Sequence, residues 1–368
     1  MDKKIAIIHD ALVVAGGAER FALILSQVFP EATIYTSAYL SGKTFSGFKS
    51  KKIKTLSGAA LVHNESQFKR LFPLWFFGFR MLDLSGYKLI LSSSTYAAKF
   101  VKTEKNSIHI CYMHSPFRFL WKRDSYSPDS VPFNKPITWL IDRFIPILRK
   151  IDLHYTRQIT QVVANSQHMA DFIKQVYKRD AIIIYPPVDV NQYHISTPRK
   201  DYYLFVGRLL SYKRADLAIK ACQRYKRKLI IIGDGPEMDS LRKIAGPETL
   251  LLGKISDEVL KQHYSEAKGL IFPGIEDFGL TPVEAQASGC PVIAMKAGGA
   301  LETVLEGETG VFFEHQTVDA LVTALSKFED IDFKADRIRQ NALKFDVSVF
   351  SSKMIALVES YLTETNKY

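Results

Sequence analysis

Short runs of consecutive apolar residues alternate along the chain with longer segments of helical periodicity. The segments that contain these runs are four or five residues long, and such short apolar runs are typical of buried parallel strands. Strands are predicted at 4–8, 88–91, 108–112 and 161–164 in the first half, and at 203–206, 228–232, 249–252, 269–272 and 291–294 in the second. Helices are predicted at 18–28, 166–177, 214–224, 236–244 and 257–267, and over the last thirty or so residues. This alternation predicts an α/β fold with two doubly wound parallel sheets.

The chain is too long for one typical hydrophobic core. Its 368 residues suit two domains of about 180 residues each. Pro186, Pro187 and Pro198 interrupt the periodicity in a polar stretch between the two sets of strands, as interdomain segments often do. We therefore expect an N-terminal domain at 1–190 and a C-terminal domain at 191–368, with the final helix packing back on the first domain.

The positive charge is confined to the first half. Residues 1–190 contain 26 Lys and Arg against 14 Asp and Glu, a net +12, whereas residues 191–368 contain 23 against 24, a net −1. An asymmetry of this kind favours an anionic partner for the first domain, either membrane lipid or nucleic acid. A surface that is basic only for solubility is the alternative.

Cysteine usage and hydropathy favour a cytoplasmic protein. The three cysteines, Cys111, Cys222 and Cys290, are far apart and odd in number, which argues against a disulfide framework and a zinc site. The apolar run at 5–8 is too short for the core of a signal peptide. The longest apolar run, 71–79, falls far short of the ~20 residues that span a bilayer.

The most informative segment, 274–285, sets Glu276 and Glu284 on either side of a glycine turn and a predicted helix start. Thr281 is the predicted N-cap, and Pro282 suits the first helical position. The backbone amides that follow Phe278 would then point outward and attract an anion. Two hydroxyl-binding acids around a phosphate site indicate a sugar nucleotide.

Two further candidate elements follow predicted strands, where open α/β sheets bind their ligands. Gly16 and Gly17 open the first helix and would let a phosphate or sugar approach the backbone. They lack the G-x-G-x-x-G spacing, which argues against a nicotinamide or flavin site, and a purely structural glycine pair is an equal alternative. Arg208 and Lys213 could hold a diphosphate and neutralise it as it departs, unless they belong to a solvated basic loop.

Histidines end two of the predicted strands. His114 follows strand 108–112 and precedes a Ser-Pro turn, so it could hydrogen-bond a sugar hydroxyl or shuttle a proton. His9 follows the first strand in the same way, and for it we favour a packing role. Asp330 and Asp332 have the spacing of a metal-binding pair but lie in an acidic stretch between helices. We expect a solvated loop there and neither a catalytic metal nor another cofactor.

Taken in order, these elements resemble the retaining GT-B glycosyltransferases of family 4, or group 1. The likeness covers essentially the whole chain, and its specific part is the E-x7-E element with upstream Arg and Lys. The elements that carry it are Gly16-Gly17, His114, Gly207-Arg208, Lys213, Gly233-Asp234-Gly235-Pro236 and Glu276 through Glu284. The resemblance implies two Rossmann-like domains facing a cleft, with the nucleotide sugar held mainly by the second and the acceptor by the first.

The resemblance also implies roles for individual residues. Arg208 and Lys213 would bind the donor diphosphate, Glu276 the hydroxyls of the transferred sugar, and Glu284 the ribose. His114 would contact the donor sugar near the reacting carbon. Further implied contacts come from Gly17 to the diphosphate and acceptor, from the backbone amides of Phe278, Gly279, Leu280 and Thr281 to the diphosphate, and from the backbone of Lys254 and Ile255 to the base.

Within the family, the segments 114–121 and 211–219 look like those of bacterial mannosyltransferases that build surface polysaccharide such as lipopolysaccharide. They make GDP-mannose the leading donor and a glycan or lipid-linked glycan the expected acceptor. A UDP-sugar donor is the alternative, because the fold does not fix the sugar. No carboxylate can be assigned as a nucleophile for a double displacement, and the family is thought to react on the front face of the sugar.

The expected partners follow from the charge and the resemblance. Segment 67–80 mixes cations with aromatic residues, as membrane-interface segments do, so we expect peripheral contact with anionic lipid at the inner face of the cytoplasmic membrane. A buried helix and loop is the alternative for this segment. Acceptor recognition is expected in loops 41–64 and 122–135.

Two other functions fit parts of the sequence less well. A nucleic-acid-binding protein would suit the charge, but Glu276 and Glu284 would repel a phosphate backbone. A GT-B epimerase or phosphorylase would need different acid and base groups, and the order of the motifs favours transfer.

Overall fold

Two parallel sheets organise the chain, one in each of two units. The structure is a computed structural model that describes residues 5–122 and 135–365. The chain divides into Met1–Tyr185 with Ser351–Tyr368, and Pro186–Phe350, whereas the sequence analysis set one boundary after residue 190. Helix α14 (Val347–Thr365) begins in the second unit and belongs to the first from Ser351 onward. Of the acceptor loops expected at 41–64 and 122–135, residues 123–134 lie outside the described part.

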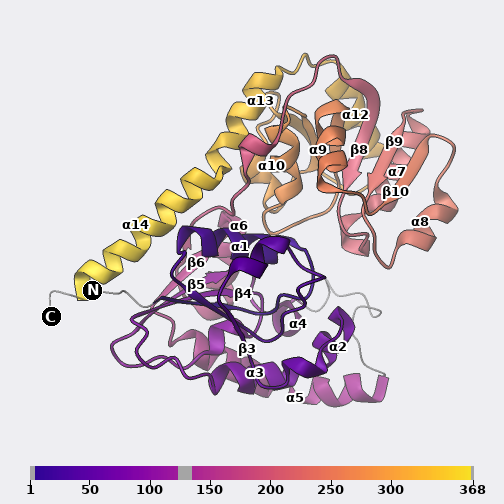
Figure 1. Ribbon diagram of the computed structural model, residues 1–368. Coiled ribbons are helices and arrows are strands. Elements are labelled where there is room, and N and C mark those ends of the chain that lie inside the picture. The colour runs from indigo at the N-terminus through magenta and orange to yellow at the C-terminus, as the bar shows by residue number, and fades with distance from the viewer. Residues whose placement is uncertain (1–4, 123–134, 366–368) are drawn as a thin grey trace. The chain divides into compact units, whose positions relative to one another are not determined.

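The first unit contains a seven-stranded sheet of order β3-β2-β1-β4-β5-β6-β7, and every pair in it is parallel (Figure 1). Its strands are β1 (Ile5–His9), β2 (Thr33–Thr36), β3 (Ile53–Thr55), β4 (Leu89–Ser94), β5 (Ile108–Met113), β6 (Gln161–Ala164) and β7 (Ile182–Ile183). Its α-helices are α1 (Gly17–Val28), α2 (Glu65–Arg70), α3 (Phe72–Arg80), α4 (Arg118–Trp121), α5 (Lys135–Thr156) and α6 (Gln167–Tyr177).

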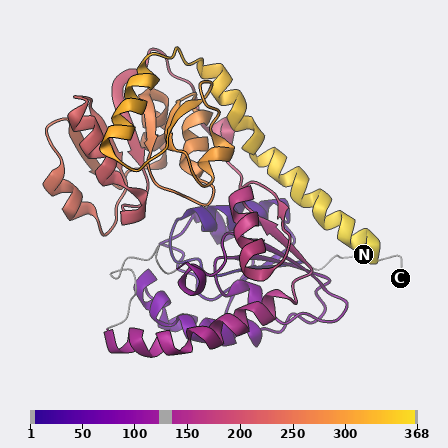
Figure 2. The same cartoon turned by 180° about the vertical axis from the view of Figure 1, so that it is seen from behind.

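Helices pack on both faces of this sheet, which explains its continuous apolar strands. On one face, Ile8 and Ile90 of the sheet share a buried cluster with Phe79 of α3 and Ile145 of α5. On the other, Phe21 of α1 packs against Tyr112 of β5 with ring centroids 4.0 Å apart. Figures 1 and 2 both show α3 and α5 running along the same side of this unit.

The second unit contains a six-stranded parallel sheet of order β10-β9-β8-β11-β12-β13. Its strands are β8 (Lys200–Val206), β9 (Leu229–Ile232), β10 (Thr249–Gly253), β11 (Ala267–Phe272), β12 (Val292–Met295) and β13 (Gly310–Phe313). Its α-helices are α7 (Ala215–Arg224), α8 (Met238–Ile244), α9 (Asp257–Glu266), α10 (Leu280–Ala287), α11 (Ala300–Thr303), α12 (Val318–Glu329) and α13 (Ala335–Ala342). Helices α7 and α12 bury one face of the sheet in a common apolar cluster.

The two parallel α/β sheets confirm the predicted fold class. All nine predicted strands are present, with ends that differ by a few residues. The sequence pattern missed the strands β2, β3, β7 and β13. Of these, β3 and β7 have only three and two residues, which is too brief for a recognisable pattern. It also ended β4 at residue 91, whereas the strand continues through three buried serines to Ser94.

Candidate functional site

Several of the predicted site residues follow the strands at which the order of each sheet reverses. In the second unit the reversal falls between β8 and β11; Arg208 follows the first of these strands and Glu276 the second. In the first unit it falls between β1 and β4, and the loop after β1 carries Gly16. Open α/β sheets bind ligands beyond the carboxyl ends of their strands at such points.

Lys213 and Glu276 meet directly. Nζ of Lys213, on the 3-10 helix η7 (Ser211–Lys213), lies 2.6 Å from Oε1 of Glu276. The side chains are 14% and 19% exposed, so the ion pair is screened less than one at the surface. Each charge is balanced by the other and is already largely removed from water. The two groups are therefore preorganised to bind a polar ligand.

Glycines allow the loop that carries Glu276 to lie against its neighbours. A Cβ at Gly274 would lie 2.9 Å from Cα of Lys213, and one at Gly299 would lie 2.2 Å from Cα of Phe278. The amide of Gly299 also donates to the carbonyl of Glu276 over 2.9 Å. The sequence analysis did not include Gly298 and Gly299 in the site; the signal was two consecutive glycines after the predicted strand 291–294.

The helix that follows this loop begins earlier than predicted. Gly279, with φ 85°, is the N-cap of α10, and Leu280 is the first helical residue. The prediction of Thr281 as the N-cap was therefore wrong. Gly279 can take the left-handed conformation that ends the turn, which leaves Thr281 inside the first turn. The first amides of this helix have no intrahelical acceptor, and the anion site expected at them stays a prediction.

Glu284 is oriented by a buried tyrosine. The hydroxyl of Tyr264, which is fully buried at the end of α9, donates to Oε2 of Glu284 over 2.9 Å. Tyr264 is therefore a supporting residue that the sequence analysis missed. Lys254 and Ile255 lie in the link from β10 to α9, where Lys254 is exposed, and Gly253 precedes them with φ 68°.

The residue before Arg208, Gly207, lies in close contact with the backbone of Gly233. Gly233 has φ 137°, and a Cβ there would lie 1.9 Å from the carbonyl oxygen of Gly207. The carbonyl of Asp234 accepts from the amide of Leu209 over 2.9 Å. The Gly233 turn is thus a structural support of the loop that carries the exposed Arg208.

In the first unit, Glu19 lies against the glycine loop. Gly16 is the N-cap of α1, and a Cβ there would lie 2.7 Å from Oε2 of Glu19. Burial raises the pKa of Glu19 to about 7, although the backbone amides of Gly16 and Glu19 act against this rise. The start of α1 therefore already faces a carboxyl group from its own first turn. Gly17 is exposed as the first helical residue.

His114 is held on several sides. Its Nε2 lies 2.9 Å from Oγ of Ser93, and the ring of Phe21 meets its imidazole edge-on at 4.9 Å. Asn165 donates from Nδ2 to its backbone carbonyl over 3.1 Å. Burial, and secondarily the repulsion that a protonated His9 would exert, lowers the pKa of His114 to about 3, so the imidazole is neutral at physiological pH.

Asp10 is a buried carboxylate that the sequence analysis did not single out. It is 5% exposed, and its oxygens accept hydrogen bonds from the amides of Thr95, Tyr96, Ala97 and Ala98 and from the Thr95 hydroxyl. These bonds fix the segment after β4 to the end of β1. A buried carboxylate needs such partners, and only the fold reveals them, because they are about 85 residues away in sequence.

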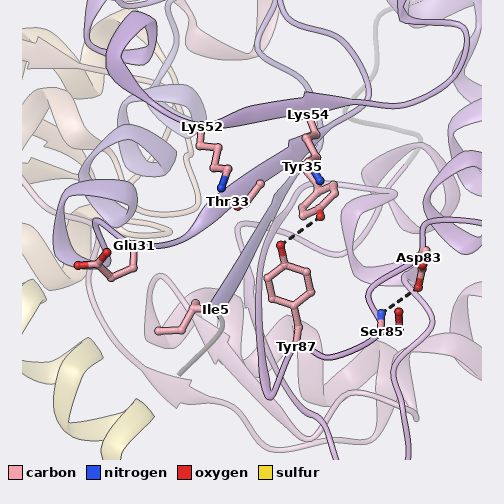
Figure 3. A pocket seen from close by; sticks show the side chains of 9 residues that line it. All are labelled: Ile5, Glu31, Thr33, Tyr35, Lys52, Lys54, Asp83, Ser85 and Tyr87. Atoms are coloured by element: carbon pink, nitrogen blue, oxygen red, sulfur yellow. Dashed lines mark hydrogen bonds between the residues drawn. The ribbon is translucent and has the colours of Figure 1, made fainter. Parts of the chain in front are cut away.

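A pocket of about 430 Å³ lies near the amino ends of strands in the first sheet. The predicted site residues of this unit follow the carboxyl ends of its strands. Figure 3 shows the hydroxyls of Tyr35 and Tyr87 in contact inside the pocket, 3.1 Å apart. Its lining contains none of the predicted site residues and consists of Ile5, Glu31, Thr33, Tyr35, Lys52, Lys54, Asp83, Ser85 and Tyr87.

Searches for two other kinds of site gave no candidate within the described part of the chain. No group of three or more His, Cys, Asp or Glu residues there could hold a metal ion. No helix there has the length and apolar composition needed to cross a membrane.

Comparison with solved structures defines the class of fold. The structure is similar to that of sucrose-phosphate synthase from Thermosynechococcus elongatus, with a TM-score of 0.76 at 16% identity. The match covers 98% of this chain and 100% of that one. The structure also matches Anabaena HepE, solved in complex with UDP, with a TM-score of 0.72 at 18% identity over 97% of this chain and 100% of that one. The fold is therefore that of the GT-B glycosyltransferases.

A family model matches most of the second unit. Residues 192–345 match the model described as Glycosyl transferases group 1. The match includes Arg208, Lys213, Glu276 and Glu284.

Curated relatives are similar over shorter stretches. A GDP-mannose-dependent alpha-(1-6)-phosphatidylinositol monomannoside mannosyltransferase of Mycolicibacterium smegmatis is 31% identical over 38% of this chain and 40% of its own length. A GDP-mannose-dependent alpha-mannosyltransferase of Corynebacterium glutamicum is 35% identical over 30% of this chain and 27% of its own. The matches thus span less than half the length of these relatives.

Proposed function

We propose that the protein is a retaining glycosyltransferase that moves a hexose from a nucleotide sugar to a hydroxyl of a glycan or lipid-linked glycan. The observation that carries the proposal is the ion pair of Lys213 and Glu276 next to the amino end of α10, within the group 1 domain. This arrangement offers a fixed cation, a carboxylate and the amides of a helix start at one place, and a sugar diphosphate needs all three.

Each group has a role in the proposed reaction. Arg208, Lys213 and the amides at 278–281 hold the diphosphate and stabilise its negative charge as the glycosidic bond breaks. Glu276 accepts hydrogen bonds from hydroxyls of the transferred sugar, and Glu284 from those of the ribose. The departing diphosphate helps to deprotonate the incoming hydroxyl, and the new bond forms on the face that the diphosphate leaves.

GDP-mannose is the leading donor in this proposal. The mannosyltransferase relatives support it, while the UDP found in HepE keeps UDP-sugars as the alternative. A panel of GDP- and UDP-sugars scored by thermal shift tests the point, because a ligand at 100 times its Kd stabilises the folded state by about 2.7 kcal/mol. A transfer assay on the stabilising donor then follows. If no nucleotide sugar raises the melting temperature, the proposed function is wrong.

We further propose that the first unit contacts anionic lipid through the outer faces of α3 and α5. Helix α3, which is part of the expected interfacial segment 67–80, has one buried face and one exposed face. Trp75 and Phe79 are 1% and 0% exposed, whereas Phe77 and Met81 are 71% and 83% exposed. At 100° per residue, Phe77 and Met81 lie about 40° apart on the face away from Trp75.

Helix α5 presents a similar outer face. Phe144 and Ile147 are 48% and 52% exposed, and the exposed Arg143 and Lys150 lie beside them on the helix. The two helices meet where the guanidinium of Arg80 lies 4.6 Å from the centre of the Tyr155 ring. Exposed apolar residues beside cations, in the half of the chain with a net charge of +12, suit an anionic bilayer surface.

Liposome co-sedimentation tests this contact. The protein should pellet with vesicles that contain anionic lipid, and Phe77→Asp with Met81→Asp should abolish pelleting. Leu250→Asp, at a residue 53% exposed in the second unit, is the matched control and should have no effect. Equal binding to neutral vesicles would contradict the proposal. A dimer in light scattering that Phe77→Asp dissolves would assign the surface to a second copy of the chain instead.

A further inference from the structure

Three polar side chains form a hydrogen-bonded line across neighbouring strands of the first sheet. Nδ1 of His9 lies 3.0 Å from Oγ of Ser93, and the same Oγ lies 2.9 Å from Nε2 of His114. His9 ends β1 and Ser93 is its partner in β4, while His114 follows β5. Ser93 is fully buried and His9 is 2% exposed, so solvent does not replace either contact.

Ser93 has one hydroxyl proton for its two imidazole neighbours. If it donates to one ring nitrogen, the other ring must donate its N–H to Oγ. If both rings donated, the Ser93 proton would need another acceptor, and none is present among the described residues. If both rings presented lone pairs, one buried nitrogen would have no partner, which is unfavourable. The two hydrogen bonds of Ser93, taken by themselves, therefore leave two proton arrangements; the backbone carbonyls of Ser93 and Ala11 also accept from the His9 ring.

The two arrangements give the histidines matching tautomers. In the first, Ser93 donates to Nδ1 of His9, and His114 donates from Nε2, so both rings carry their proton on Nε2. In the second, Ser93 donates to Nε2 of His114, and both rings carry their proton on Nδ1. Burial lowers the pKa of both imidazoles, that of His114 to about 3. Neither ring is therefore doubly protonated at neutral pH.

We propose that Ser93 and His9 are positioning residues that decide whether Nδ1 of His114 accepts or donates a hydrogen bond toward a substrate hydroxyl at the first unit. Within the described residues, Nδ1 of His114 has no hydrogen-bond partner, and the imidazole is only partly buried. The rings of Phe21 and Tyr112, at 4.9 and 5.1 Å, keep it in place. The role in transfer rests on the proposed function, whereas the coupling of tautomers is a property of the unliganded protein.

Nitrogen-15 NMR of the histidine-labelled protein tests the coupling, because ring nitrogens with and without a proton have different chemical shifts. His9 and His114 are expected to be neutral and to show the same tautomer at pH 7. Opposite tautomers, or a doubly protonated ring at either position, would overturn the proposal. The measurement needs no substrate.

The chain offers a matched control on the same strand. Oγ of Ser92 lies 2.8 Å from Nε2 of His109, so Ser92→Ala removes a buried serine–histidine hydrogen bond of similar length on the other face of β4. Ser93→Ala should change the ring signals of His9 and His114, while Ser92→Ala should leave them unchanged. If both variants changed these signals alike, the effect would be a general loss of packing and the specific role of Ser93 would be refuted.

Kinetics then connect the coupling to transfer. With a donor identified, Ser93→Ala should lower kcat about tenfold, as expected for one hydrogen bond, with little change in donor KM, and Ser93→Thr should restore part of the rate. Ser92→Ala should remain near the unmodified rate. Matched tautomers in a protein that transfers no sugar would leave the coupling intact and refute the proposed function alone. Unchanged kcat in Ser93→Ala would refute the positioning role.

Discussion

Lys213 donates a hydrogen bond from Nζ to Oε1 of Glu276 over 2.6 Å, although the two residues are 63 positions apart. The carboxyl ends of β8 and β11, which are neighbours in the second sheet, bring them together. Gly274 makes the approach possible, because a side chain there would collide with the backbone of Lys213. The ion pair is thus a product of strand order and of one residue without a side chain.

Replacing Lys213 with Ala should reduce turnover by ~10²–10³, the usual loss when one preorganised charge-stabilising donor is removed. The matched control is Lys220→Ala, which removes a half-exposed lysine paired with Asp216 in the same unit. Steady-state kinetics with the donor that the thermal-shift panel selects would measure both. A Lys213→Ala enzyme as fast as the control would remove Lys213 from the site.

The ion pair should also appear as an energetic coupling in the absence of substrate. Removing either partner leaves the other charge partly buried and unpaired, so the double variant Lys213→Ala with Glu276→Gln should lose less stability than the two single variants together. Contacting residues typically couple by about 0.5–3 kcal/mol. Urea unfolding of the four proteins measures the coupling, and strict additivity would mean that the pair does not form in solution.

Glu284→Ala should raise the Kd of the nucleotide about tenfold, the effect of one or two lost hydrogen bonds. Tyr264→Phe should raise it less, since it removes only the group that orients Glu284. Tyr225→Phe is a suitable control, because Tyr225 also donates to a carboxylate, that of Glu329, in the same unit. Isothermal titration with the nucleoside diphosphate alone gives the three values. An equal Kd for Glu284→Ala and Tyr225→Phe would exclude Glu284 from the binding site.

The buried ion pair of Lys99 and Asp152 should be important for folding of the first unit. The side chains are 1% and 0% exposed with Nζ and Oδ1 2.8 Å apart, and Asp152 also accepts from Trp121 and Tyr177. Lys99→Met should destabilise the protein by about 3–5 kcal/mol, because it leaves a buried carboxylate unpaired.

The exposed ion pair of Lys69 with Glu65 serves as the comparison. Lys69→Met should change the free energy of unfolding by at most about 1 kcal/mol. Replacing both buried partners, with Lys99→Met and Asp152→Leu, should recover part of the stability lost in the single variant. Chemical denaturation measures all three, and a Lys99→Met protein as stable as Lys69→Met would show that the buried pair is dispensable.

Stability should fall in mild acid because of His109. Burial lowers the pKa of this histidine from 6.5 to about 3. Between these values the unfolded chain binds a proton that the folded chain does not, so the folded state loses about 1.4 kcal/mol per pH unit as the pH falls below 6.5. His114, whose pKa is also lowered to about 3, contributes in the same way, so His109→Gln should make this dependence less steep between pH 6.5 and 4 without removing it, and the exposed His63→Gln should leave it unchanged. Urea unfolding at several pH values distinguishes the two.

The sequence alone determined the class of fold, and it located the candidate site residues of the second unit, whose role stays a prediction. Buried parallel strands are continuous apolar runs, so all nine predicted strands could be located without structural information. The element from Glu276 to Glu284 was also visible, because its glycine, its proline and its two acids are close in sequence. Such local patterns can be read from a few neighbouring residues, because the residue types of a short segment indicate its backbone conformation and burial.

Tertiary structure decided the contacts between distant segments. Sequence spacing gave no sign that Asp10 binds the segment at 95–98, that Tyr264 orients Glu284, or that Ser93 joins His9 to His114. These pairs depend on which strands are neighbours in a sheet. Even the start of α10 was decided by a conformation, since the left-handed Gly279 and not Thr281 precedes the helix. These hydrogen-bond partners meet because the strands that carry or adjoin them are neighbours in a sheet. Strand order is set by the packing of the whole sheet, so a local segment of sequence does not determine it.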